Sequence, residues 1–260
     1  MILKKIKEKI SCNRFLFEEL VKRDFTKKYK RTVLGMLWSV IGPLMTLGVM
    51  ALVFTKFFGR NIQHYIIYLF CGNLIFSYFK ESTFTGMTSL YDNAAIFSKV
   101  NVPKYMFLLS KNTAALINFG INIAIMFIFV AADGVAFSWK FIFLLYPVVC
   151  LIAFNLGTGL ILSAMYLMFK DTKYLYDIFT LLLMYVSAIF YDISVYSEAM
   201  QKLFYLNPVY VYISYFREII LDNTIPSPSL HLLAAGYAAA ALIIGMLIYK
   251  KNNYKFLYYI

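Results

Sequence analysis

Histidine, cysteine and charged residues are scarce in this chain of 260 residues. Its two histidines form no H-E-x-x-H pattern, so no zinc-protease motif is present. Its three cysteines, Cys12, Cys71 and Cys150, lie too far apart to suggest a metal or disulfide spacing. Charged residues make up 15% of the chain, against about 25% in a typical soluble domain. These deficits exclude a disulfide scaffold and argue against an ordinary cytosolic enzyme.

Motifs for catalysis are missing as well. No Gly-Lys pair occurs, which excludes a Walker A loop and an ATP site on this chain. The sequence has no G-x-S-x-G nucleophile elbow and no carboxylate cluster of the kind that binds metal. Matching interrupted halves, typical of many secondary transporters, are also absent. We therefore expect no catalytic, cofactor-binding or metal-binding residue, and we expect any ATP and Mg²⁺ to bind a partner subunit.

Hydrophobic residues, in contrast, make up 62% of the chain, and its mean hydropathy is +0.70. An apolar helix needs about 20 residues to cross roughly 30 Å of hydrocarbon. The apolar stretches predict an all-α integral membrane protein with six transmembrane helices in a domain over residues 32–249. The expected spans are 32–55, 61–82, 110–132, 141–169, 175–195 and 229–249.

Lysine and arginine are distributed unevenly about these spans. Nineteen of the 25 fall on the side that both termini share, and five fall on the other side. The positive-inside rule then predicts cytoplasmic termini (residues 1–31 and the tail 250–260). The same rule accounts for most of the net charge of +12, so nucleic acid is not expected as a partner.

The segment 13–31 is predicted to be an amphipathic helix. Phe17, Val21, Phe25 and Tyr29 recur every four residues and form one apolar stripe. Such a helix lies in the membrane interface and leads into the first span. Two roles remain open from the residues, a simple membrane anchor and a docking surface for a partner.

Two connections contain more residues than a tight turn needs. In 92–111, Pro103 disfavours helix at the preceding residue, so we expect a break that either docks a soluble partner or lies in the interface. In 192–228, Asn207-Pro208 is a good start for a helix that is too short to span and so re-entrant or interfacial. Lys80 and Glu81 are expected near the cytoplasmic boundary, roughly 28 Å along the second span.

Several motifs, in order, resemble one family. Leu20–Gly42 with Pro43 following resembles the N-terminal signature of type-2 ABC transporter permeases, in particular those that export O-antigen, capsule or teichoic-acid polymers. Further agreement lies at Lys99–Pro103, at Lys170-Asp171 and at Leu206–Pro208 leading to Phe216-Arg217. One departure concerns the fifth span, which in the family often ends in an S-P-x-F-Y-P-like sequence. Here Ser187–Asp192 lacks both prolines, which puts the outer kink in doubt.

The resemblance implies a homodimeric half-transporter that works with two copies of a separate ABC ATPase. Its substrate would be a polysaccharide linked to undecaprenyl diphosphate, surrounded by membrane lipids during export. The resemblance implies ATPase docking or coupling by Phe25, Lys99, Val100, Asn101, Val102 and Pro103. It implies a conduit between the first and fifth spans, with candidate lining residues Trp38, Ser39, Tyr185, Phe190 and Tyr191. The outer gate would be the 195–222 hairpin, with candidate residues Asn207, Pro208, Tyr212 and Arg217.

Other functions compete with this one. A type-2 ABC permease for a small hydrophobic drug or lipid differs in features that are not decisive. A membrane enzyme acting on lipid-linked sugar would need ionisable residues facing a cavity, and few are present. A channel that works without ATP would need no cytoplasmic docking surface.

Overall fold

The computed structural model describes residues 2–30, 32–59, 62–100 and 102–259. Every regular element within these ranges is a helix, as the sequence predicts. The long helices are α1 (Ile2–Tyr29), α2 (Trp38–Phe58), α3 (Tyr65–Asp92), α5 (Tyr105–Ala132), α6 (Leu145–Met168), α7 (Thr172–Val186) and α10 (Pro228–Asn252). The short α-helices are α4 (Ala94–Phe97), α8 (Glu198–Phe204) and α9 (Pro208–Ile220). Short 3₁₀ turns cover Gly35–Leu37, Trp139–Leu144, Ile193–Val195 and Lys255–Leu257.

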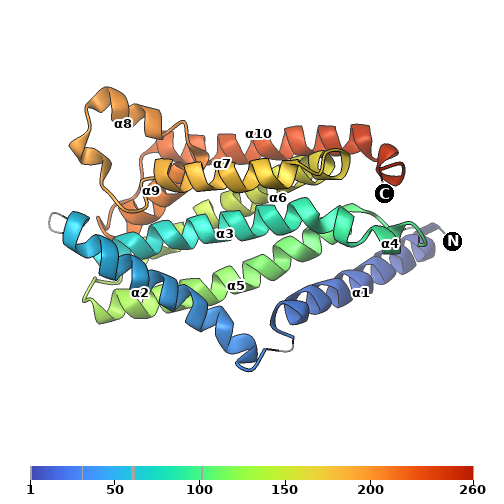
Figure 1. Ribbon diagram of the computed structural model, residues 1–260, viewed down its shortest axis with the longest axis horizontal. Coiled ribbons are helices and arrows are strands. Elements are labelled where there is room, and N and C mark those ends of the chain that lie inside the picture. The colour runs from blue at the N-terminus through green and yellow to red at the C-terminus, as the bar shows by residue number, and fades with distance from the viewer. Residues whose placement is uncertain (1, 31, 60–61, 101, 260) are drawn as a thin grey trace.

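The long helices run along one common direction (Figure 1). The start of α1, the end of α10 and α4 lie at one end of this bundle, and α8 and α9 lie at the other. We refer to the first as the α4 end and to the second as the α9 end. Both ends of the chain thus lie on one side of the bundle, which agrees with the expectation that the termini share a side of the membrane.

Among the described residues, four helical segments are long and apolar enough to cross a membrane, which indicates a multi-pass membrane protein. They are Gly35–Phe58, Tyr105–Ala132, Trp139–Met168 and Pro228–Asn252. The other two expected spans correspond to α3, which carries polar and charged residues along its length, and to α7, which has only 15 residues.

Helix α3 occupies the centre of the bundle and packs against α2, α5, α6 and α9. It is buried on most sides, from Tyr65 and Ile67 at its start to Leu90 near its end. Apolar side chains fill this core and hold the helices together through close van der Waals packing. The consequence for function is that four polar residues of α3 are also buried among other helices, namely Asn73, Ser82, Thr83 and Ser89.

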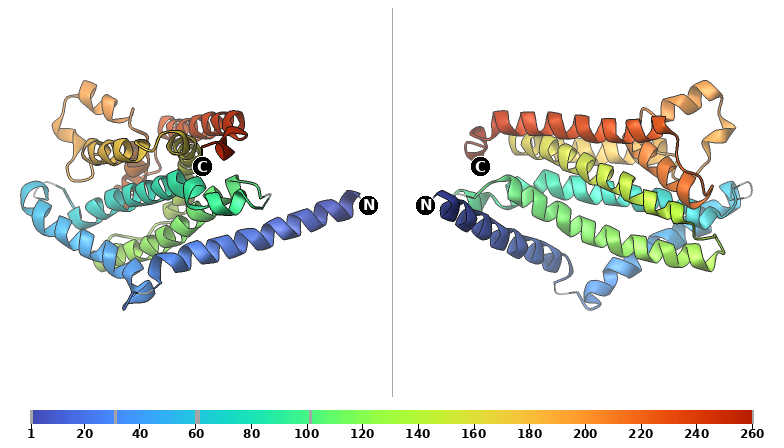
Figure 2. Two further views of the ribbon diagram at one scale, coloured as in Figure 1. Left: turned by 45° about the vertical axis from the view of Figure 1, so that its right-hand side comes forward. Right: turned by 180° about the vertical axis from the view of Figure 1, so that it is seen from behind.

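Helix α1 lies along the start of α5, at the α4 end of the bundle (Figure 2). Its buried Leu20 joins an apolar cluster with Phe97, Met106 and Phe107, and Leu16 and Phe17 pack against this cluster. Asp24 also accepts a hydrogen bond from the Ser110 hydroxyl at 2.8 Å. The amphipathic helix is therefore present, and its apolar side faces the bundle.

The fifth expected span, 175–195, is helical only in its first part. Helix α7 ends at Val186, although the family's prolines are absent. The break occurs because Ala188 adopts a left-handed conformation with φ of +47°, which an α-helix does not contain. The kink that the missing prolines put in doubt is thus present, and the left-handed conformation of Ala188 produces it.

Candidate functional site

The segment after α7 is non-helical backbone inside the bundle. Ser187, Ala188, Ile189 and Phe190 are each buried. Carbonyl groups in such a place need hydrogen-bond donors, since water is excluded and helix bonds are lost. We call residues 187–191 the break segment.

Arg217 of α9 supplies two of these donors. Its Nη1 donates to the Ala188 carbonyl oxygen at 2.9 Å, and its Nη2 donates to the Ile189 carbonyl oxygen at 3.0 Å. Its guanidinium also lies over the Tyr68 ring, 3.4 Å from the centroid. The side chain is only 7% exposed, so carbonyl oxygens and an aromatic face replace water around a buried cation.

Two tyrosines at the start of α3 complete the set. The Tyr65 hydroxyl donates to the Phe190 carbonyl oxygen at 2.7 Å, and the Tyr68 hydroxyl donates to the Tyr191 carbonyl oxygen at 2.6 Å. Four consecutive carbonyl groups, from Ala188 to Tyr191, are therefore bound by side chains of α3 and α9. These hydrogen bonds hold the break segment in one conformation.

Gly72 of α3 allows this close packing. A Cβ at this position would lie 3.0 Å from Arg217 Nη2 and 3.2 Å from the Ile189 Cα. Any side chain there would press on the guanidinium and on the backbone that it binds. The sequence analysis missed Gly72, Tyr65 and Tyr68, because their partners lie more than a hundred residues away along the chain.

Two of the four candidate gate residues, Asn207 and Arg217, bind the break segment. The Asn207 Nδ2 donates to the Ser187 hydroxyl at 2.9 Å, and its Oδ1 accepts from the Val209 amide as the cap of α9. Pro208 is the first residue of α9, as predicted. Tyr212 lies elsewhere: it is fully buried and donates to the Ala234 carbonyl oxygen of α10 at 2.9 Å. Tyr212 therefore helps to pack α9 against the bundle.

The candidate conduit residues divide into two groups. Phe190 stacks on Phe54 of α2 at 4.4 Å, and the Tyr191 hydroxyl donates to the carbonyl oxygen of the exposed Tyr185 at 2.8 Å. Trp38 and Ser39 lie at the opposite end of α2 from Phe58, about 30 Å away at the rise of an α-helix. The structure thus joins the outer end of α2 to the break segment through Phe54, a residue that the sequence analysis did not select.

A polar cavity of about 410 Å³ opens beside Arg217 at the α9 end. Tyr68, Tyr205, Tyr210, Asp192, Glu218 and Asp222 are among its lining residues. Burial raises the pKa of the Glu218 carboxyl, and burial together with nearby Asp192 raises the pKa of Asp222. Tyrosine rings beside carboxylates can bind the apolar faces and hydroxyl groups of a sugar.

The candidate coupling residues lie mainly between α4 and α5. Lys99 is exposed, the Val100 side chain is 56% exposed, and Val102 and Pro103 are half-buried. Asn101 lies outside the residues that the structure describes. The next residue, Lys104, donates to the Asn253 carbonyl oxygen at 2.7 Å and lies near the Phe97 and Phe256 rings. This segment is therefore tied to the C-terminal end of α10 while its tip remains accessible.

Phe25 differs from the other candidate coupling residues. It is half-buried and lines a cavity with Asp24, Glu81 and Lys111. Its ring therefore lies on the side of α1 that faces α3 and α5. A role in coupling would have to act through the contact between α1 and the bundle.

Comparison with known proteins agrees with this architecture. Residues 16–221 match the family model described as ABC-2 type transporter. An O-antigen export system permease protein RfbA of Myxococcus xanthus is 25% identical over 247 residues, 94% of each chain. A protein of the same name from Klebsiella pneumoniae is 24% identical over 249 residues, covering 93% of this chain and 95% of the relative. The match extends from α1 through the break segment to α9, and the chain belongs to the ABC-2 type transporter family of membrane proteins.

Proposed function

We propose that this chain is the membrane subunit of an ATP-driven exporter that moves an undecaprenyl-diphosphate-linked polysaccharide of the O-antigen type across the bacterial cytoplasmic membrane. The observation that carries the proposal is its similarity, over more than nine-tenths of both chains, to permeases named for O-antigen export. The conduit aromatics and the tyrosine-lined cavity beside Arg217 suit a sugar chain better than a small hydrophobic drug.

A separate ATPase is part of the proposal. The sequence contains no Walker A loop, so the energy has to come from another subunit. The exposed tip at Lys99 and Val100 is the proposed contact, with two copies of the ATPase below two copies of this chain. Leu52 of α2 and Ile178 and Leu182 of α7 are largely exposed, so these helices have apolar faces that can contact lipid or a second copy.

The break segment and α9 form the proposed outer gate. The break separates the direction of the chain after Val186 from that of α7. Because Tyr65 and Tyr68 also bind the break segment, α9, the break segment and the start of α3 can move as one body. Hydrogen bonds from Arg217 and Asn207 hold this body together. Movement of α1 and the coupling segment upon ATP hydrolysis would then bias α2 and α7 toward an open arrangement, since Phe54 of α2 stacks on Phe190.

Co-purification tests the proposal directly. The chain is expressed with the ABC ATPase encoded beside it, and the mass, stoichiometry and ATPase activity of the solubilised material are measured. We expect two copies of each subunit and ATP hydrolysis that depends on this chain. A chain that purifies alone and leaves hydrolysis unchanged would contradict the proposal and favour a channel.

The substrate is tested in cells. Deleting the gene for this chain should leave the lipid-linked polysaccharide on the cytoplasmic side of the membrane, and restoring the gene should return the polymer to the cell surface. Surface polysaccharide that persists without the chain would assign export of this polymer to another protein.

A further inference from the structure

A polar groove runs along α3 on the side away from α6. Three adjoining cavities, of about 130, 440 and 400 Å³, all have Glu81 in their lining. Their walls come from α2, α3, α5 and the end of α1. The two larger volumes fall within the range of ordinary ligand pockets. Residues 99–103, which we call the coupling segment, and the break segment do not line this groove where the structure describes them, whereas the earlier candidates Phe25, Trp38 and Ser39 do.

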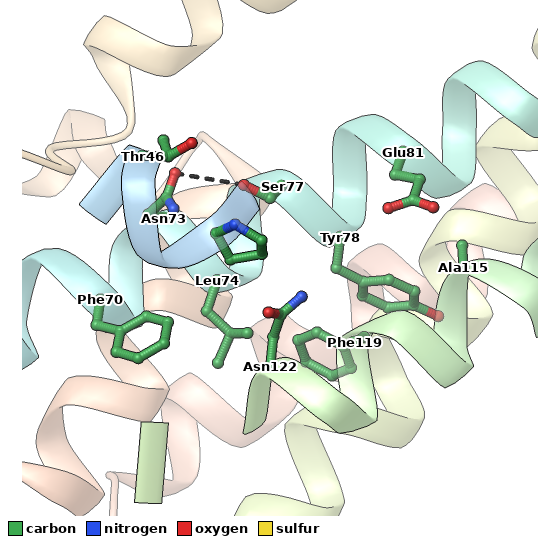
Figure 3. A pocket seen from close by; sticks show the side chains of 11 residues that line it. Thr46, Phe70, Asn73, Leu74, Ser77, Tyr78, Glu81, Ala115, Phe119 and Asn122 are labelled. Atoms are coloured by element: carbon green, nitrogen blue, oxygen red, sulfur yellow. Dashed lines mark hydrogen bonds between the residues drawn. The ribbon is translucent and has the colours of Figure 1, made fainter. Parts of the chain in front are cut away.

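Polar residues on three helices face the groove at helical spacing. On α3, Asn73, Ser77, Glu81 and Thr85 follow one another every four residues, so they share one face. On α5, Asn118 and Asn122 have the same spacing, and Thr46 approaches from α2. Figure 3 shows five of these side chains around the innermost cavity, together with the rings of Tyr78 and Phe119; the five are Thr46, Asn73, Ser77, Glu81 and Asn122.

Placing these polar residues in membrane-spanning segments costs free energy. Thr46, Asn118 and Asn122 lie inside two of the segments that are apolar enough to cross a membrane. Polar groups at such depth are rare, and where they occur they mark pathways or binding sites. Their presence on three neighbouring helices at one groove therefore calls for a ligand with hydrogen-bonding groups.

The alternative is that these groups only join helices to one another, as Asn118 and Lys28 do by donating to Glu81, and the contacts of the other groups argue against it. The Ser77 hydroxyl donates to Asn73 Oδ1 at 3.3 Å, and the Thr46 hydroxyl donates to the Gly42 carbonyl oxygen, each within its own helix. Asn122 Oδ1 is buried and finds no donor among the described residues. Part of the hydrogen-bonding capacity of the groove is therefore left for a ligand.

The charges at the groove favour a neutral ligand. Glu81 accepts from Lys28 Nζ at 2.6 Å and from Asn118 Nδ2 at 2.9 Å. Its negative charge is thus balanced by a lysine of α1. Asp24 and Lys111 also line the groove, and they pair with Arg23 and with Asp92, while Lys27 is exposed. The uncharged polar groups that line the groove along α3 and α5 are amides and hydroxyls, which both donate and accept, as sugar hydroxyls do.

We infer that this groove is an entry subsite, which binds the hydroxyl-rich sugar end of a lipid-linked saccharide while the lipid stays in the bilayer. The inference rests on the proposed function and adds a place where the substrate is held before it reaches the outer gate. The start of α2 diverges from α3 and α5 (Figures 1 and 2), and one of the three cavities has Thr32, Trp38 and Ser39 of this region in its lining, so we place the entrance there. Trp38, at that start, lines the outermost of the three cavities and is 46% exposed.

The fluorescence of Trp38 can be used to measure binding at this groove. The full chain with Trp139→Phe, which leaves Trp38 as its one tryptophan, is placed in phosphatidylcholine nanodiscs with increasing digalactosyldiacylglycerol, a neutral glycolipid. We expect a saturable change in tryptophan emission. Asn122→Leu and Ser77→Ala should each weaken the apparent affinity about three- to tenfold, the loss of one hydrogen bond. Thr113→Val on α5, whose hydroxyl donates to the Leu109 carbonyl oxygen and does not line the groove, is the matched control.

Three results would overturn the inference. One is the absence of a saturable response, and another is an equal response in Asn122→Leu and Thr113→Val. The third is an equal response to phosphatidylglycerol, which would assign the groove to an ordinary phospholipid headgroup. Co-purification of the same variants with the ATPase separates this inference from the proposed function. If the complex forms and exports polymer but shows no glycolipid response, the inferred entry subsite is wrong and the proposed function still holds.

Discussion

At the scale of single residues, Arg217 is the side chain on which most of the candidate gate depends. It is buried, and it binds the carbonyl groups of Ala188 and Ile189 from a distance of about thirty residues along the chain. Without it, these carbonyl groups would be left inside the protein without donors. A buried acceptor that loses its donor costs about 1–3 kcal/mol.

Replacing Arg217 with methionine should therefore destabilise the protein by about 2–5 kcal/mol, because at least two carbonyl groups lose their donors. Thermal unfolding of the purified protein measures the effect as a lower Tm. Arg14→Met is the control, since Arg14 is exposed on α1 and pairs only with Glu18 among the contacts described for it. Equal Tm values for the two variants would show that the guanidinium does not hold the break segment.

Ala188 offers a second test at this scale. Its φ of +47° is unfavourable for any residue with a Cβ and more so for a β-branched one. Ala188→Gly should leave the Tm unchanged or raise it slightly, and Ala188→Val should destabilise the protein by about 1–3 kcal/mol. If valine were tolerated as well as glycine, the left-handed turn would not be what ends α7.

At the scale of elements, the close contact between α6 and α10 fixes one side of the bundle. A Cβ on Gly157 would lie 2.3 Å from the Ala241 carbonyl carbon, and a Cβ on Gly245 would lie 2.4 Å from the Gly157 carbonyl oxygen. Small residues let the two backbones touch, which is how membrane helices gain packing without a hydrophobic driving force. Tyr212 of α9 then binds to this pair from the side.

Gly157→Ala should force α6 and α10 apart and destabilise the protein by about 1–3 kcal/mol. Gly236→Ala in α10 is the matched control, because nothing lies within 4 Å of its Cβ position. That variant should be neutral or stabilising, since alanine favours helix over glycine. Chemical unfolding in detergent compares the two, and a loss of stability in both would point to a general effect of glycine replacement.

At the scale of the whole molecule, the coupling segment and the candidate gate lie at opposite ends of the bundle (Figure 1). Helix α3 runs from Tyr65, which binds the break segment, to Asp92, which precedes α4. A signal from the ATPase would therefore pass along α3 or along the α1–α2 connection. Such coupling needs an element with two arrangements that both sites bias.

Val100→Pro tests this arrangement. The Val100 amide donates to the Ile96 carbonyl oxygen at 2.9 Å, and proline removes that donor at an exposed tip. We expect membrane insertion and co-purification to persist while polysaccharide export falls at least tenfold. The measurement is surface polysaccharide against the amount of chain in the membrane fraction. Unchanged export would remove residues 99–103 from the coupling role.

The sequence by itself determined the helical membrane architecture, the start of α9 and the family resemblance. Apolar runs of spanning length predict helices wherever they occur, and Asn207-Pro208 starts a helix through its own side chain and ring. These are local properties, readable from neighbouring residues. The segment 175–195 shows the limit of such reading, because hydrophobicity alone does not reveal where α7 ends.

Only the tertiary structure decided which residues work together. Arg217 meets Ala188, Tyr68 meets Tyr191, and Tyr212 points to α10, and no spacing along the chain encodes those contacts. The polar groove depends likewise on three helices that each present a stripe of polar residues to the same place. The physical reason is that a buried hydrogen-bonding group must find a partner in space, whereas the sequence specifies only which groups need one.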